Sequence, residues 1–383
     1  MNPMLDDQEV SLFRDTVRGF MQKEVAPHYE QWEKDKCIPK SFWLKMGEQG
    51  MLCADIPEEY GGIGTDFRFN MVVIEEASRA GFAALATNLT VHSDICAHYI
   101  LNMGNEAQKH KYLPKMVSGE CIGAICMTEP GAGSDLQGMK TNAVKNGNEW
   151  RLNGSKTFIT NGQNASLYIV AARTNLQVKA AKGLSLFLVD GDKAGFQRGQ
   201  NLHKMGQHAA DTSELFFEDV ILSDEDILGP QDGGFIALMQ ELPRERLALA
   251  VGAVSHAEGA LYLATQYVKE RQAFGGPLTN LQSVRFSLAE MATQVELHKA
   301  LNEKCKGLLM EKALSTELAS MAKYAATDME CKVIDQALQL FGGYGYMQEY
   351  PISRFYVDAR VQRIYGGTNE IMKEIISRKL VAD

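Results

Sequence analysis

Residues 125–135 read Ile-Cys-Met-Thr-Glu-Pro-Gly-Ala-Gly-Ser-Asp, and residues 155–162 read Ser-Lys-Thr-Phe-Ile-Thr-Asn-Gly. Each block combines strand-forming residues with hydroxyl side chains, and the first runs directly into a glycine-rich turn. Because glycine has no Cβ, backbone N–H groups in such a turn can approach an anion closely. A turn of this kind is by itself usually an ordinary connecting loop without a binding function, so only the pairing of the two blocks is informative.

The sequence pattern changes on both sides of these blocks. Apolar residues recur at helical spacing over 7–25, 67–79, 83–103 and 105–117. Between residues 121 and 221 the apolar runs are short and rich in β-branched and aromatic residues, and Asn146-Gly147 and Asn153-Gly154 are hairpin-turn dipeptides. Long helical patterns return over 243–271, 281–311 and 316–341. The order predicts an α+β protein with a helical domain over 1–120, an antiparallel β domain over 121–232 and a helical domain over 233–383.

Composition excludes several classes of protein. The chain has 383 residues, 45% of them hydrophobic, and a net charge of −9, which argues against a nucleic-acid binder. No apolar run approaches the roughly 20 residues that span a bilayer. The acidic start has no apolar segment typical of a signal peptide, and seven cysteines without C-x-x-C spacing indicate reduced thiols. We therefore expect a cytoplasmic protein without a membrane segment or a metal site.

Together the two blocks resemble the flavin-binding signature of the acyl-CoA dehydrogenase family, and the resemblance extends over nearly the whole chain. It implies that family's fold: an N-terminal α domain, a middle β-barrel-like domain and a C-terminal four-helix bundle. It also implies FAD as the cofactor. By match to the family's motif, Met127 and Thr128 would contact the flavin ring, and the Thr160 hydroxyl would reach its N5 side. Phe158 would stand beside the ring where the family often has tryptophan.

The resemblance implies further cofactor contacts in the C-terminal third of the chain. Arg271 and Gln282 would reach the FAD of a neighbouring subunit, which implies a homotetramer built as a dimer of dimers. A guanidinium suits such a bidentate phosphate contact, although a helix-end arginine alone would more often be simply solvated. The full set of implied FAD contacts here is Arg271, Phe274, Gln282, Gln339, Gly342, Gly343, Thr368, Asn369 and Glu370, with Ser134 added from the first block.

The main departure from the family concerns the catalytic base. Dehydrogenation of an acyl thioester needs a carboxylate in a dry cavity to remove the α-proton. Most of the family carries a Glu immediately before Gly-Thr, but this chain has Gly366 there, followed by Gly367 and Thr368. Some relatives carry the base on the long helix in a Glu-Arg pair, and this chain has Glu245-Arg246 at the matching place.

Glu245 is therefore the candidate base. Pro243 suits the first turn of a helix, which predicts that Glu245 lies near the helix start. There the helix dipole favours the anion, whereas an apolar cavity favours the neutral acid, so the sequence leaves the net pKa open. The alternative reading is a first-turn carboxylate that only serves the helix end.

The resemblance also implies contacts to the substrate. The Gly366 backbone N–H would hydrogen-bond the thioester carbonyl, and Arg246, Ser134 and Gly367 would line the thioester and CoA end of the site. The segments around Glu245 and Gly366 are most similar to the long-chain branch of the family. This implies dehydrogenation of a medium- to long-chain acyl-CoA in fatty acid β-oxidation, with electrons passed to electron transfer flavoprotein.

Three alternatives stay open at this point. An acyl-CoA oxidase would reduce oxygen instead, but such chains usually run much longer. A nitroalkane oxidase uses a carboxylate at the position of Gly366, which disfavours it. The alternative from a different class is a CoA- or flavin-binding protein without catalysis, in which Glu245 is structural.

Overall fold

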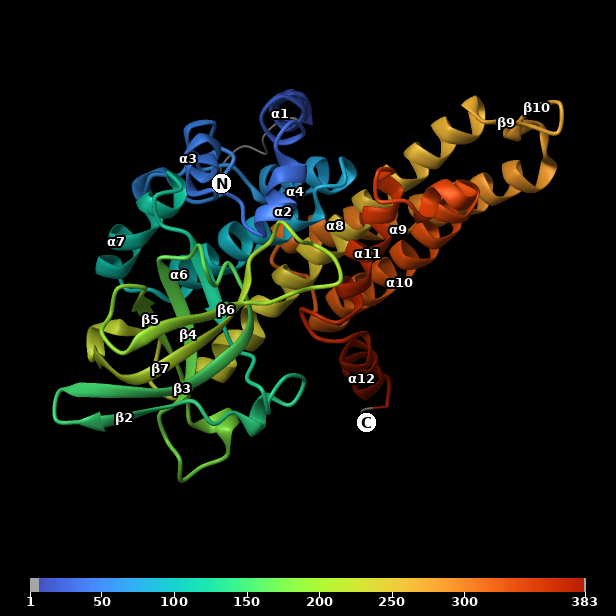
Figure 1. The fold of residues 1–383 in the computed structure, drawn as a ribbon. Helices are drawn as coiled ribbons and strands as arrows, with labels where there is room; N and C mark the ends of the chain where they lie inside the picture. Colours follow the sequence, from blue (N-terminus) through green and yellow to red (C-terminus); the bar gives the residue numbers. More distant parts are fainter. Residues whose placement is uncertain (1–6, 382–383) are drawn as a thin grey trace.

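The computed structural model describes residues 7–381, so the acidic N-terminal start lies outside the described residues. Figure 1 shows a helical N-terminal part, a β domain and a second helical part with three long helices running side by side. The predicted domain boundaries fall in the connections, because the first strand begins at Gly123 and the long helix α8 begins at Gly234. The predicted order of helical, β and helical parts is confirmed.

The N-terminal part is a set of short helices. Its elements are α1 (Asp7–Phe20), η1 (Met21–Val25), α2 (Tyr29–Asp35), α3 (Lys40–Glu48), η2 (Glu58–Tyr60), α4 (Phe67–Arg79), α5 (Ala83–Leu89), η3 (Thr90–Cys96), α6 (Ala97–Met103) and α7 (Glu106–Val117). Helix α7 begins at a capping box, in which the Asn105 side chain accepts from the Gln108 N–H and the Gln108 side chain accepts from the Asn105 N–H. Residues 83–103 run through α5, η3 and α6 without a break, and we call them the central helical segment.

The β domain is one eight-stranded sheet. Its strands are β1 (Gly123–Cys126), β2 (Asn142–Asn146), β3 (Glu149–Thr160), β4 (Leu167–Arg173), β5 (Leu184–Asp190), β6 (Phe196–Asn201), β7 (Thr212–Ser223) and β8 (Ile227–Leu228). They follow the order β6-β7-β3-β2-β4-β5-β8, with β1 beside β4. Strands β4 and β5 are almost wholly buried, which explains their continuous apolar sequence.

Two sequence expectations for this domain were wrong in part. The sheet is mostly antiparallel, but β4 pairs in parallel with β1 and, at Asn142, with β2. Asn146-Gly147 forms the predicted hairpin turn, with Gly147 at φ 63°, whereas Asn153-Gly154 lies inside β3. At Gly154 the register with β7 shifts, and a Cβ there would lie 2.7 Å from the Thr141 Cα. This glycine therefore permits a close backbone approach rather than a turn.

The C-terminal part is built on three long helices. They are α8 (Gly234–Glu270), α9 (Gln282–Met310) and α10 (Thr316–Leu340), followed by the shorter α11 (Pro351–Ala359) and α12 (Asn369–Leu380). A small hairpin of β9 (Gln272–Ala273) and β10 (Gly276–Pro277) joins α8 to α9 at the end of the bundle far from the β domain (Figure 1). Helix α11 packs against α8 and α10 as the fourth helix of the bundle.

Two predictions about α8 are corrected by the structure. The helix begins at Gly234, so Pro243 lies in its interior and Glu245 is far from the helix start. Because proline lacks an N–H, the helix continues there with one backbone hydrogen bond fewer. By length and composition α8 is also apolar enough to cross a membrane, contrary to the expectation that no run comes close. However, 78% of its most apolar window is buried inside the protein, as in the core helix of a soluble protein.

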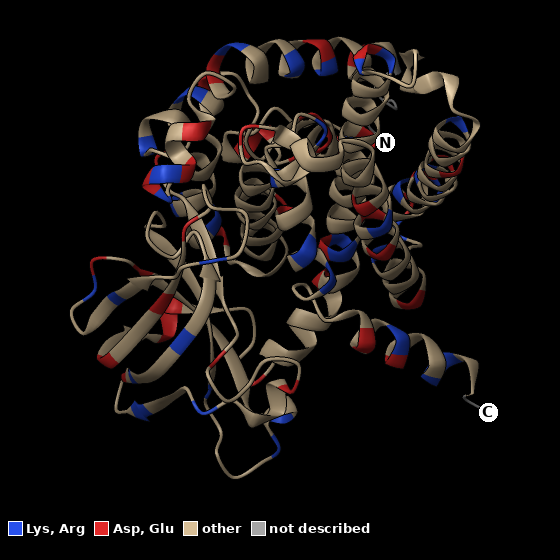
Figure 2. Cartoon of the chain, turned by 45° about the vertical axis from the view of Figure 1, so that its right-hand side comes forward, with Lys and Arg blue, Asp and Glu red and all other residues tan. Residues whose placement is uncertain are grey.

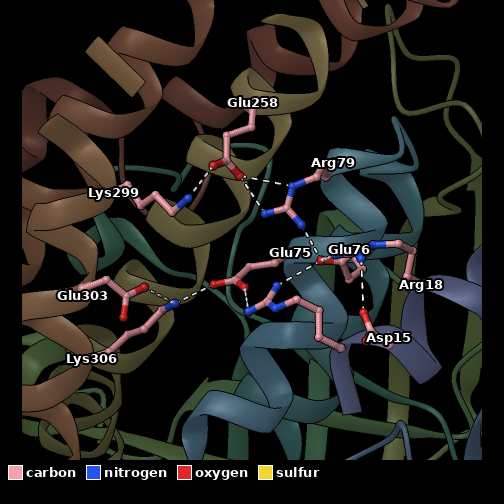
Figure 3. A network of polar contacts seen from close by, with 10 residues as sticks. Asp15, Arg18, Glu75, Glu76, Arg79, Glu258, Lys299, Glu303 and Lys306 are labelled. Carbon is pink, nitrogen blue, oxygen red and sulfur yellow. Dashed lines mark hydrogen bonds and ion pairs between the residues drawn. The ribbon is translucent and has the colours of Figure 1, made fainter. Parts of the chain in front are cut away.

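Charged side chains are interspersed along the helices (Figure 2), and ten of them join the N-terminal part to the bundle. Figure 3 shows this network between α1, α4, α8 and α9. Its residues line a cleft with a volume of about 460 Å³. The ion pairs are Arg14–Glu75, Arg14–Glu76, Arg18–Asp15, Arg18–Glu76, Arg79–Glu76, Arg79–Glu258, Lys299–Glu258, Lys306–Glu75 and Lys306–Glu303. Because nearly every charge has an opposite partner, the network ties the helices together and leaves no cation free for a ligand.

Candidate active site

The central helical segment brings the three parts of the chain together. Its Asn88 carbonyl accepts from Asn161 Nδ2 at 3.1 Å, which fixes the end of β3. Its Thr87 hydroxyl lies 3.2 Å from the Tyr365 hydroxyl, next to Gly366. Its Tyr99 hydroxyl donates to Glu245 Oε1 at 2.9 Å. The predicted flavin block, the Gly366 turn and the candidate base are thus all anchored to one buried run of helix.

The two sequence blocks that define the flavin signature are joined by a buried lysine. Lys156, from the second block, donates to the Met127 carbonyl at 3.0 Å and to Glu129 Oε1 at 2.9 Å, both in the first block. Between the same blocks the Thr157 N–H donates to the Thr128 carbonyl at 2.9 Å. Burial alone would raise the pKa of Glu129, but the charge of Lys156 and nearby donors hold that pKa below its usual value. The two blocks therefore form one rigid platform.

Phe158 stands out on this platform. It has φ 59° at a register shift between β3 and β7, and 68% of its surface is exposed. A left-handed phenylalanine costs of order 1–3 kcal/mol and is found mainly where function requires it. Met127, Thr128 and Thr160 are half-buried beside it in the two blocks. The exposure and the unfavourable backbone conformation of Phe158 are both explained if a planar ligand ring packs against its side chain.

Glu245 lies in a dry environment, with 3% of its surface exposed. Burial is the main cause that raises its pKa to about 7, and the nearby carboxylate of Glu241 adds to the rise. The Tyr99 hydrogen bond and the charge of Arg246 act in the opposite direction. The question that the sequence left open is thus answered by burial, since the helix dipole does not act at this interior position. A carboxyl group with a pKa near 7 is suited to general-base catalysis at neutral pH.

The turn at Gly366 and Gly367 adopts a backbone conformation that favours glycine. Their φ values are 63° and 90°, and a Cβ on Gly366 would overlap the Leu249 side chain. Arg246 is buried one helical turn before Leu249, donates to the Ser320 hydroxyl at 3.2 Å, and lies 4.0 Å from where a Cβ on Gly367 would be. The structure therefore places Arg246 next to the glycine turn.

The three residues after this turn have different environments. The Thr368 hydroxyl caps α12 by accepting from the Ile371 N–H at 3.3 Å. Asn369 is buried, and its side-chain amide donates to Thr327 and accepts from Lys323, so only its backbone is left for a cofactor. Glu370 is exposed on the first turn of α12.

The remaining predicted contacts lie at the opposite end of the bundle. Arg271 directly precedes β9, and Phe274 lies in the turn between β9 and β10, where it is 90% exposed with φ 52°. The Arg271 guanidinium lies over the Tyr344 ring at 5.5 Å, which places the end of α10 beside the hairpin. We call this set the outer group, and its members are Arg271, Phe274, Gln282, Gln339, Gly342 and Gly343. One chain cannot bring the outer group to the Phe158 platform, which lies in the β domain (Figure 1).

Open space surrounds four of the glycines that the sequence singled out. A Cβ placed on Gly131, Gly133, Gly342 or Gly343 would meet no atom within 4 Å. Ser134 is exposed in the same turn as Gly131 and Gly133. Nothing within this chain therefore requires glycine at these positions for space, although Gly342 has φ 58°. This accords with a ligand or a second subunit approaching the backbone closely.

Sequence reasoning missed several residues of the site. Tyr99 is hidden in an apolar helical run, and Lys156 and Lys323 look like ordinary surface lysines until the structure shows them 1% and 0% exposed. A usable signal was present in α10, where the charged Lys323 interrupts a buried face made largely of small residues. Within residues 7–381 no group of three or more His, Cys, Asp or Glu is placed to hold a metal ion.

Three family models cover the chain in order. Models described as the acyl-CoA dehydrogenase N-terminal, middle and C-terminal domains match residues 7–120, 124–220 and 232–381. The chain belongs to the acyl-CoA dehydrogenase family. Members of this family are flavin-dependent oxidoreductases of fatty acid metabolism, so the family, the fold and the class of enzyme expected from the sequence are confirmed.

Individual acyl-CoA dehydrogenases match over nearly their full length. The mitochondrial long-chain specific acyl-CoA dehydrogenase of Mus musculus is 49% identical over 376 residues, which cover 98% of this chain and 87% of the relative. An acyl-CoA dehydrogenase structure from Geobacillus kaustophilus has a TM-score of 0.96 at 46% identity, covering 99% of both chains.

Two further structures bear on ligands and partners. A chain in a structure titled for the electron transferring flavoprotein of Acidaminococcus fermentans matches with a TM-score of 0.95 at 37% identity, covering 100% of both chains. A glutaryl-CoA dehydrogenase from Mycobacterium smegmatis in complex with FADH2 matches with a TM-score of 0.92 at 28% identity, over 99% of this chain and 96% of that one.

Proposed function

We propose that this acyl-CoA dehydrogenase converts a medium- to long-chain acyl-CoA, branched chains included, into the trans-2-enoyl-CoA, with Glu245 as the base. The observation that carries the proposal is a buried carboxyl group with a pKa of about 7 on α8, combined with glycine at position 366. The exposed Phe158, the open glycine turn and the outer group are chemically suited to FAD. When bound, FAD supplies the two-electron acceptor for the hydrogen that leaves the β-carbon.

The residues of the chain divide the remaining work. Glu245 in its carboxylate form takes the α-proton, and Tyr99 holds that carboxylate in place through its hydroxyl. The Gly366 N–H binds the thioester carbonyl and stabilises the negative charge that develops on its oxygen. Burial of Glu245 keeps water away from the proton transfer.

The proposed length of the acyl chain rests on the space at position 366 and on the similarity to a long-chain relative. Gly366 has no side chain where most of the family has glutamate, and the side chain of Leu249 lies there instead. A base placed on α8 leaves that end of the site apolar, which favours a long or branched acyl group. The 49% identity to a relative named for long-chain substrates points the same way.

An anaerobic titration of the purified protein tests the proposed function. Palmitoyl-CoA and octanoyl-CoA should bleach the flavin absorbance, and both should give a higher kcat/KM than butyryl-CoA or glutaryl-CoA. Binding without bleaching by any acyl-CoA would instead identify a protein that binds but does not catalyse. The best kcat/KM on butyryl-CoA or glutaryl-CoA would contradict the proposed chain length.

We also propose electron transfer flavoprotein as the acceptor. The neighbour structure titled for that protein supports this partner. Turnover should therefore require added electron transfer flavoprotein or an artificial dye. Rapid turnover with oxygen alone would contradict it.

The rate should depend on pH through Glu245, because only its carboxylate can accept a proton. With a pKa of about 7 in the free protein, kcat/KM should rise as pH increases from 6 to 8. Tyr99→Phe removes a hydrogen bond that stabilises the carboxylate, so the rising limb should move up by about one pH unit. Tyr112→Phe is the matched control, because it removes a buried tyrosine hydroxyl that bonds Asp190, which does not act on the pKa of Glu245. An unshifted limb in Tyr99→Phe would mean that another group controls the rate.

Glu245 makes stability and rate depend on pH in opposite directions. As pH rises, the rate should increase while the contribution of Glu245 to the free energy of unfolding decreases. Its pKa in the folded protein lies above the ordinary value of 4.5, so folding favours the protonated form. The stabilising contribution is therefore complete below about pH 4.5 and is lost as pH rises through about 7.

The separation of the outer group from the Phe158 platform motivates a proposal about assembly. We propose a homotetramer in which the outer group of one subunit completes the FAD site of its neighbour. Arg271→Ala should lower the FAD content of the purified protein, whereas Arg378→Ala, an exposed arginine on α12, should not. Light scattering together with the flavin-to-protein absorbance ratio measures both quantities. A monomer with full FAD would refute the assembly.

A further inference from the structure

Lys323 on α10 is a fully buried cation that holds the glycine turn. It is 0% exposed, and its Nζ donates to the Gly367 carbonyl at 2.8 Å and to Asn369 Oδ1 at 3.0 Å. Two consecutive glycines with positive φ are the most flexible kind of dipeptide, so the turn needs an external restraint to keep one conformation. The two Lys323 hydrogen bonds supply that restraint from a long, buried helix.

Lys323 has no ion-pair partner in the described part of the chain. Neither has Arg246, which is 3% exposed and has only the Ser320 hydroxyl as a hydrogen-bond partner. Other buried cations of this protein behave differently. Lys156, Lys306 and Arg244 each have a carboxylate oxygen within 2.9 Å. The two unpaired cations are thus specific to the surroundings of the Gly366 turn.

Burying two like charges, neither of which forms an ion pair among the described residues, is costly. Burial first, and then the charge of Arg246, lowers the pKa of Lys323 to about 7. The acidic groups that oppose this effect are Asp328 and Glu330 on α10 and Glu370 on α12. None of them forms an ion pair with Lys323 among the described residues, and Asp328 pairs instead with Arg363. An anionic oxygen bound at the turn would relieve the repulsion between the two cations.

We propose that Lys323 is a positioning residue that fixes the Gly366–Gly367 turn and, together with Arg246, makes it complementary to an enolate oxygen. The ligand class is the oxyanion of an acyl thioester that has lost its α-proton. Lys323 acts on it through the turn and through its charge, not by contact. This inference rests on the proposed function, because only proton removal by the base creates such an anion.

The test uses the FAD-loaded protein and a 3-oxoacyl-CoA, whose acidic α-proton can leave without any net oxidation. Formation of its enolate is measured through the long-wavelength absorbance that an electron-rich anion gives beside an oxidised flavin. In the wild type, the apparent pKa of the bound ligand should lie well below its value in water. Lys323→Met should raise this apparent pKa by about 1–3 units, because a nearby positive charge is lost.

Two more variants separate charge from hydrogen bonding and from fold stability. Lys323→Gln keeps an N–H donor for the Gly367 carbonyl but no charge, so its ligand pKa should lie between those of wild type and Lys323→Met. Lys306→Met is the matched control, since it removes a buried lysine that pairs with Glu75 at the cleft between α1, α4, α8 and α9. It should leave the ligand pKa unchanged. Binding of an unreactive acyl-CoA thioether should stay within about threefold of wild type in all three, because this ligand places no negative charge at the turn and gains little from the cation.

A measurement on the wild-type protein complements the variants. Coupling between two sites is reciprocal, so enolate binding must stabilise the Lys323 ammonium by the same free energy. Carbon-13 NMR of labelled lysine should therefore show the pKa of Lys323 rising when the 3-oxoacyl-CoA is added. This measurement decides the matter even where a variant fails to hold FAD.

The possible failures are distinguishable. An unchanged ligand pKa in Lys323→Met and Lys323→Gln, or an unchanged lysine pKa in the NMR experiment, overturns the role of Lys323 and leaves the proposed function intact. A wild-type protein that neither forms the enolate nor is bleached by acyl-CoA overturns the proposed function, and this inference with it.

Discussion

Glu245→Gln should slow flavin reduction by acyl-CoA by about 10²–10⁴-fold, because glutamine cannot accept the α-proton. The amide has nearly the same shape as the carboxyl group, and its carbonyl can still accept the Tyr99 hydroxyl. FAD content and acyl-CoA binding should therefore remain close to wild type. Anaerobic stopped-flow absorbance measures the rate of reduction, and equilibrium titration measures binding.

A neighbouring carboxylate provides the control. Glu241→Gln changes a buried glutamate one turn away that accepts from Asn102, and it should affect the rate far less. A carboxylate returned to position 366 should restore part of the activity of Glu245→Gly. The structure adds a requirement here, because a side chain at Gly366 meets Leu249 and has an unfavourable φ. The rescue therefore needs Leu249→Ala as well. If Glu245→Gln reduces flavin as fast as wild type, the base lies elsewhere.

Lys156→Met should lower the free energy of unfolding by about 3 kcal/mol and reduce FAD binding. Breaking a buried ion pair costs about 3–5 kcal/mol, and the lower end applies since Glu129 keeps two backbone N–H donors. The variant also removes the donor to the Met127 carbonyl, so the two flavin blocks lose their common restraint. Chemical denaturation of the apoprotein and FAD titration measure the two effects separately.

A double variant identifies the cause. In Lys156→Met combined with Glu129→Met no unpaired charge is buried, so its loss of stability should be smaller than the sum of the two single changes. Additive losses would mean that the two side chains do not act as a pair. Unaltered FAD affinity in Lys156→Met would mean that the platform is rigid without its lysine.

The sequence predicted the general fold well, because periodicity and turn chemistry act locally. The pattern over 67–79 corresponds to α4 residue for residue, and 83–103 forms the central helical segment. Strand β6 was missed because it is short and has no fully buried residue, so it lacks an apolar run, whereas the hairpin turn at Asn146-Gly147 implied β2. The start of α8 was predicted wrongly at Pro243. The helix continues through this proline because buried residues both before and after it pack against the protein, which outweighs the local preference of proline for a helix start.

The site was predictable in its residue types but not in its arrangement. Glu245, Arg246 and the glycine turn were proposed from the family's motif, and the structure places Arg246 next to the turn. Their electrostatics depend on burial and on partners more than 70 positions away in the chain, such as Tyr99 and Ser320. The outer group was found by the same motif, yet its distance from the platform is a property of the assembly, which no single-chain pattern describes.

The central helical segment has a consequence for how this sequence can evolve. Residues of one short run contact the β domain through Asn88, the glycine turn through Thr87 and the base through Tyr99. A change in this run alters all three parts at once, so substitutions in one part are accepted only with matching ones in the others. Transplanting a middle domain from a relative should therefore succeed only when residues 83–103 are transplanted with it. In structure and in evolution, these residues therefore belong to the β domain and the bundle as much as to the N-terminal part in which they lie.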